Sequence, residues 1–80
     1  MPTITIYPDP PLRGELLSVS TDDELPKKLT VLWKLANGSS QTEPLTLNEA
    51  KENITVPMTA VSVNIHDTDE ECADVSRVVL

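Results

Sequence analysis

The chain has 80 residues, a formal net charge of −7, one cysteine, one tryptophan and no phenylalanine. This length allows a single domain, residues 1–80, whose core is too small to enclose a large cofactor or a deep substrate cleft, so a self-contained enzyme is not expected. The acidic charge disfavours nucleic acid, because phosphate binding needs clustered lysine and arginine, and it suits a basic protein partner, a divalent cation or simple solubility.

The start of the sequence alternates between apolar and polar residues and lacks the basic and apolar regions of a signal peptide. No apolar run is long enough to span a bilayer, so we expect no membrane partner. The single Cys72 cannot form an intrachain disulfide, and its acidic neighbours are expected to keep the thiol protonated and unreactive. We therefore expect synthesis in the cytoplasm, with a virion as a later location.

In the first half of the chain, alternating apolar residues predict four strands, at residues 3–7, 15–20, 29–35 and 43–47. The third is the stretch around which the fold is expected to be built. Leu29, Val31, Trp33 and Leu35 share one face of it, and the indole of Trp33 is the largest apolar side chain available to a core.

The second half predicts three more strands, at residues 53–57, 60–66 and 75–80. Between the fourth and fifth strands, residues 47–52 are expected to form one turn of helix or a loop, because Thr46 and Glu49 have capping-box spacing. The same spacing at Thr68 and Glu71 leaves a short helix within residues 69–80 as the alternative to the last strand.

Seven short strands separated by turn signals are typical of an all-β, two-sheet Greek-key sandwich. Gly14-Glu15-Leu16-Leu17-Ser18-Val19, Leu29-Thr30-Val31-Leu32-Trp33 and Thr59-Ala60-Val61-Ser62-Val63 resemble the second, third and sixth strands of an immunoglobulin-like or fibronectin-III-like domain. The chain departs from antibody-type domains because it lacks their cysteine pair and the tyrosine near the sixth strand. Compact modules of this kind serve as attachment, decoration or spacer units, including those on bacterial-virus heads and tails and on bacterial surface proteins.

In such a sandwich, the loops between strands two and three, four and five, and six and seven gather at the same end. Those loops hold most of the acidic residues, which the topology therefore predicts to crowd one pole: Asp22, Asp23, Glu24, Glu49, Glu52, Asp67, Asp69, Glu70, Glu71 and Asp74.

Three interpretations of this acidic pole are open. Salt and water can simply screen the repulsion between the carboxylates. Calcium can bind, with Asp67, Asp69 and Glu71 as the candidate ligands, although no EF-hand pattern is present. A basic protein can dock on the pole. Zinc spacing is absent, and the single His66, on the solvent side of its strand, completes no catalytic triad with Cys72.

Two functions follow from these features. The first is a non-catalytic structural or protein-interaction module without a cofactor, a homo-oligomer or a subunit of a larger assembly such as a virion or a cell surface. The alternative is a small acidic inhibitor that mimics a polyanion and blocks a basic protein groove.

Overall fold

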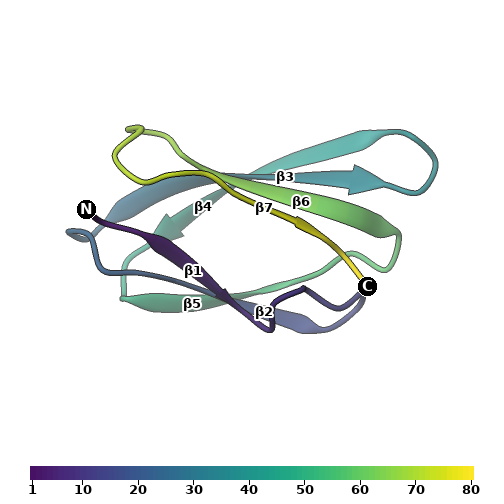
Figure 1. Cartoon of the computed structure of the whole chain (residues 1–80), viewed down its shortest axis with the longest axis horizontal. Helices are drawn as coiled ribbons and strands as arrows, with labels where there is room; N and C mark the ends of the chain where they lie inside the picture. Colours follow the sequence, from purple (N-terminus) through teal and green to yellow (C-terminus); the bar gives the residue numbers. More distant parts are fainter.

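The computed structural model describes all 80 residues and contains seven strands and no helix. In chain order they are β1 (Ile4–Tyr7), β2 (Leu16–Thr21), β3 (Lys27–Leu35), β4 (Ser40–Leu47), β5 (Lys51–Thr55), β6 (Ala60–Asp67) and β7 (Val75–Val78). They form two antiparallel sheets, one with the order β1-β2-β5 and one with the order β4-β3-β6-β7 (Figure 1). The predicted all-β class with seven strands is confirmed.

The two sheets lie face to face in a sandwich-like arrangement (Figure 1). Alternate residues of their strands are buried and form one apolar core. Fifteen buried apolar residues form this core, and Trp33 is its largest fully buried side chain. The indole Nε1–H donates a hydrogen bond of 3.3 Å to Oε1 of Glu43 on β4, which satisfies its only polar group. The alternation in residues 29–35 therefore identified the centre of the core correctly.

Of the two alternatives for residues 47–52, the turn of helix is absent and the loop is correct for residues 48–50. The chain bends at residues 48–50 and enters β5 at Lys51, where it pairs with β2 in a register that places Ile54 opposite the buried Leu17. Pairing with β2 and the packing of Ile54 against the core outweigh the local preference for a helix. The helix considered within residues 69–80 is also absent, because Val75–Val78 pairs with β6.

The connections β2–β3, β4–β5 and β6–β7 lie at one end of the molecule, beside the N-terminus (Figure 1). The other three connections and the C-terminus lie at the opposite end. The structure has no helix of the length and hydrophobicity that a membrane crossing requires.

Candidate functional site

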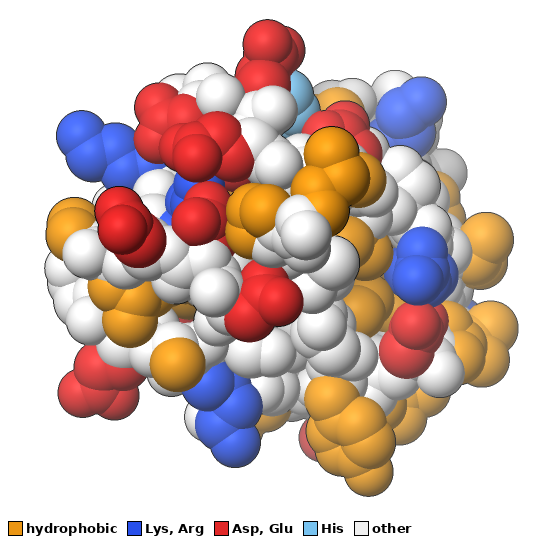
Figure 2. Space-filling model, turned by 60° about the vertical axis from the view of Figure 1, so that its left-hand side comes forward, with side chains coloured by type: hydrophobic (Ala, Val, Ile, Leu, Met, Phe, Trp, Pro, Cys, Tyr) orange, Lys and Arg blue, Asp and Glu red, His pale blue; other side chains and the backbone are white.

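The acidic residues concentrate at the end that carries the β2–β3, β4–β5 and β6–β7 loops. Figure 2 is turned toward this end and shows acidic side chains spread over the upper part of the surface. The acidic end is defined here by ten residues in or beside these loops: Asp22, Asp23, Glu24, Glu49, Glu52, Asp67, Asp69, Glu70, Glu71 and Asp74. These are ten of the thirteen acidic residues, and three of the six basic residues accompany them: Lys27, Lys28 and Lys51. The remaining three acids and three bases balance, so the formal charge of −7 belongs to this end.

A buried lysine lies beneath these acids. Lys27, the first residue of β3, is only 3% exposed, and its Nζ lies 2.9 Å from Oδ2 of Asp67 and 2.6 Å from Oδ2 of Asp23. The exposed carboxylate of Glu71 lies 3.6 Å from the same Nζ. Because Asp23 lies in the β2–β3 loop and Asp67 is the last residue of β6, this one ammonium group ties that loop to the end of β6.

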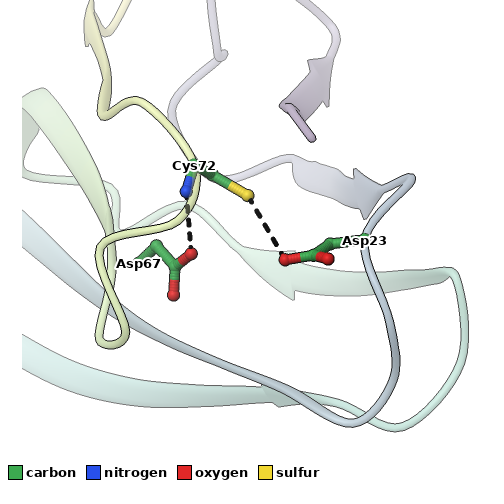
Figure 3. Close-up of side chains that lie close together, drawn as sticks. All are labelled: Asp23, Asp67 and Cys72. Atoms are coloured by element: carbon green, nitrogen blue, oxygen red, sulfur yellow. Dashed lines mark hydrogen bonds between the residues drawn. The ribbon is translucent and has the colours of Figure 1, made fainter. Parts of the chain in front are cut away.

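The carboxylate of Asp67 is fully buried and organises the start of the β6–β7 loop. Its Oδ1 accepts a hydrogen bond of 2.9 Å from the backbone N–H of Asp69. Its Oδ2 accepts bonds of 3.0 and 2.9 Å from the N–H groups of Glu71 and Cys72. The thiol of Cys72 points toward Asp23, with Sγ 4.0 Å from Oδ2 (Figure 3). A negative charge inside the protein is tolerated here because both carboxylate oxygens accept hydrogen bonds and one of them faces the ammonium group of Lys27.

The pKa values of this cluster reflect the same contacts. Burial alone would raise the pKa of Asp67, but the hydrogen bonds from Lys27 and from three backbone N–H groups lower it well below the usual carboxyl range. The pKa of Lys27 is raised by its bonds to Asp23 and Asp67, and the pKa of Asp23 is lowered chiefly by Lys27. Lys27, Asp67 and Asp23 are therefore all charged at neutral pH.

Sequence reasoning attributed an elevated pKa of Cys72 to its acidic neighbours. In the structure burial is the largest cause, followed by Asp67, and the thiol is buried as well as protonated. This arrangement is typical of an unreactive structural cysteine.

The ten residues of the acidic end are not uniformly exposed. Asp67 lies inside the protein, which corrects the expectation that its carboxylate faces a partner. Asp23 and Glu52 are half-buried, and the exposed members are Asp22, Glu24, Glu49, Asp69, Glu70, Glu71 and Asp74.

The structure gives no support to calcium at Asp67, Asp69 and Glu71. Asp69 and Glu71 contact Asp67 through their backbone N–H groups, while their own side chains are exposed. The ligand atoms that do lie together, within 4.8 Å of one another, belong to Asp23, Asp67 and Cys72. Lys27 already brings a positive charge to both of these carboxylates, so a cation there would have to displace its ammonium group.

A second, exposed cluster connects β6 to the end of the β6–β7 loop. Nδ1 of His66 lies 2.8 Å from Oδ1 of Asp74, and Nε2 lies 4.0 Å from Oε1 of Glu70. The hydrogen bond to Asp74 raises the pKa of His66, and the pKa of Asp74 is correspondingly lowered. Sequence reasoning placed His66 on the solvent side correctly but did not foresee these partners.

Sequence reasoning also missed Lys27, although a signal was present. Lys27 shares the inward parity of Leu29, Val31 and Trp33, and Asp67 shares that of Val63 and Ile65. A charged residue that continues an inward-facing series is a candidate for a buried ion pair.

Comparisons with protein-family models, with curated proteins and with solved structures found no match to this chain.

Proposed function

We propose that this chain is a non-catalytic interaction module with an immunoglobulin-like or fibronectin-III-like fold, which docks on a basic protein surface through the exposed carboxylates of its acidic end. It acts as a subunit of a larger assembly, for which a virion and a cell surface are the settings that the resemblance implies. The segregation of the whole net charge to one end is the observation that carries this proposal.

The strand order supports the fold assignment. Strands β1, β2 and β5 form one sheet and β3, β6 and β7 belong to the other, as in the seven-stranded immunoglobulin arrangement. The fourth strand joins β3, whereas the fourth strand of constant-type domains joins the fifth. This difference argues against the constant-type immunoglobulin arrangement.

The Lys27 cluster supports the docking role. Neutralising Asp67 and Asp23 from inside leaves the exposed carboxylates on loops that are held in place by the cluster's contacts. Loops ordered before binding lose less conformational entropy when a partner engages them. Exposed carboxylates on such loops attract a basic surface over a distance set by the Debye length, about 8 Å at physiological ionic strength.

The test measures association with a basic probe protein, lysozyme, by biolayer interferometry at low and at physiological salt. Glu24→Gln removes an exposed charge at the acidic end, and Glu15→Gln removes one at the opposite end; neither side chain makes a hydrogen bond or ion pair. We expect Glu24→Gln to slow association about twofold and Glu15→Gln to leave it nearly unchanged. Equal effects would show that total charge, and not the acidic end, determines binding.

The alternative, a polyanion mimic, is tested by competition. A mimic displaces duplex DNA from the basic groove of a DNA-binding protein, and its affinity falls steeply between low and moderate salt. Lysozyme binding without displacement of DNA favours the docking module. Displacement of DNA at concentrations where lysozyme binding is negligible would favour the mimic.

A further inference from the structure

The end opposite the acidic loops carries most of the large hydrophobic side chains that are exposed. Nine large hydrophobic side chains are exposed, and only Met1 and Leu25 belong to the acidic side. The other seven define the apolar end: Tyr7, Leu12, Leu16, Met58, Val61, Val78 and Leu80. Exposed apolar side chains that occur singly need no explanation, whereas a contiguous group indicates an interaction surface.

Backbone contacts bring members of this group together from distant parts of the sequence. Leu80 donates its N–H to the carbonyl of Pro11 at 2.9 Å, and its own carbonyl accepts the N–H of Arg13 at 2.8 Å. This pairing sets Leu12 beside Leu80.

Met58 adjoins the same segment, because its sulfur occupies the space where a side chain on Gly14 would lie. Gly14 has a φ of +75° and also donates its N–H to the carbonyl of Val56 at 2.9 Å. The close approach of Met58 therefore depends on the absence of a Cβ at residue 14.

The charge distribution indicates which partner fits this surface. Outside the acidic end the molecule is neutral, with three acidic and three basic residues, and Arg77 and Asp9 neutralise each other at 2.9 Å. A basic partner gains nothing from a neutral end, and an anionic lipid surface requires the clustered lysine and arginine that are missing here. A second copy of the chain offers an end that is equally neutral and equally apolar.

Self-association through this end also minimises repulsion. The molecule is 36 Å long, several times the Debye length of about 8 Å, so two copies that meet at their apolar ends keep their acidic ends electrostatically independent. Contact through the acidic ends would bring two charges of −7 together. We propose that two copies of this chain associate through their apolar ends, around Leu12, Met58 and Leu80, into a two-fold dimer whose acidic ends point outward.

The expected dimer is weak. A standard interface covers about 800 Å² per partner, which is roughly one sixth of the 4839 Å² surface of this chain. The Cα cross-section of the molecule is only 19 × 18 Å, so the contact reaches that area only by continuing along β7 to Val78. The dimer presents two acidic ends that point in opposite directions, so it can join two separate basic surfaces. It does not depend on the docking proposed above.

Sedimentation velocity of the unmodified chain from about 5 µM to about 500 µM, at physiological and at high salt, tests this inference. We expect the average mass to rise from 8.8 kDa toward twice that value, and to persist at high salt because the contact is apolar. Leu12→Glu and Met58→Glu should each shift the dissociation constant at least about tenfold toward the monomer. Leu25→Glu is the matched control, because Leu25 is 41% exposed, as Leu12 is, but lies at the acidic end.

Emission of the buried Trp33 verifies that each variant is folded, and Leu80→Ser provides a third substitution in case one charged variant unfolds. A monomer at every concentration would overturn the inference. So would a dimer that resists the three apolar-end variants or dissociates equally with Leu25→Glu. None of these results bears on lysozyme binding by the acidic end, so the two proposals fail separately.

Discussion

Replacing the fully buried Asp67 by asparagine is the sharpest test of how the acidic end is held together. The substitution keeps the shape of the side chain and removes its charge. In the unmodified protein, Oδ2 of Asp67 accepts hydrogen bonds from the N–H groups of Glu71 and Cys72 and from Lys27. Its Oδ1 accepts one from the N–H of Asp69. An amide has a single acceptor oxygen, so one of these two sets must face its NH₂ group.

The loss in free energy of unfolding is smaller when the amide oxygen of the new asparagine faces Lys27. The N–H of Asp69 then loses its acceptor, which costs about 1–3 kcal/mol, and the charge-assisted bonds of Asp67 become neutral ones, which costs roughly another 1–2 kcal/mol. Removing one member of a buried pair typically costs about 3–5 kcal/mol. We expect about 3 kcal/mol for Asp67→Asn, the lower end of that range, because the ammonium group keeps Asp23 as a partner.

A domain of this size has a total stability of roughly 3–5 kcal/mol, so Asp67→Asn should bring it close to unfolding at 25 °C. Urea titration at pH 7, followed by the emission of Trp33, measures the change directly. Asp69→Asn is the control: its side chain is exposed and its backbone N–H is retained, so we expect a change below about 0.5 kcal/mol. A loss of less than about 1 kcal/mol for Asp67→Asn would refute the view that this carboxylate organises the loop.

Three further results are expected. The lowered pKa values of Asp23, Asp67 and Asp74 contribute stability that is complete above the ordinary carboxyl value of 3.8 and is lost as pH falls through the folded values. The urea midpoint should therefore drop steeply below about pH 4, and a midpoint constant down to about pH 2 would contradict the charged cluster. The raised pKa of His66 contributes stability that is complete below the ordinary value of 6.5 and is lost as pH rises through the folded pKa. In NMR titrations, Asp74→Asn should return the pKa of His66 toward 6.5. An unchanged pKa would exclude Asp74 as the cause of the shift. Burial of Cys72 should make its reaction with a thiol reagent at least about a hundredfold slower in the folded protein than in denaturant, whereas immediate labelling of the folded protein would show that the thiol is accessible.

Much of the fold could be predicted from residue patterns alone. The alternation in residues 29–35 located the core strand and its tryptophan, because side chains of a strand point to opposite faces with a period of two. Strand boundaries were less accurate: β4 begins at Ser40, where the prediction began at residue 43, and β5 occupies Lys51–Thr55 where 53–57 was expected. Polar edge strands carry a weak pattern, and the neighbouring strand decides where they start.

The gathering of the acidic loops depended on topology. Residues 22–24 and 67–74 are more than forty positions apart, and only the order of strands within each sheet brings them to one end. The assumed sandwich predicted this proximity. It did not predict that Asp67 turns inward while Asp69 and Glu71 face solvent, because that distinction depends on where β6 ends and the loop begins.

The sequence by itself determined the all-β class, the inward face of the central strand and the excess of negative charge, because these follow from residue type and local periodicity. Only the tertiary structure decided that Lys27 meets Asp67, forty residues away, since the β3–β6 register sets the end of one strand against the start of the other. Local patterns say which way a side chain points, whereas pairing between distant strands fixes what it points at, and the stability of a buried charge depends entirely on that partner.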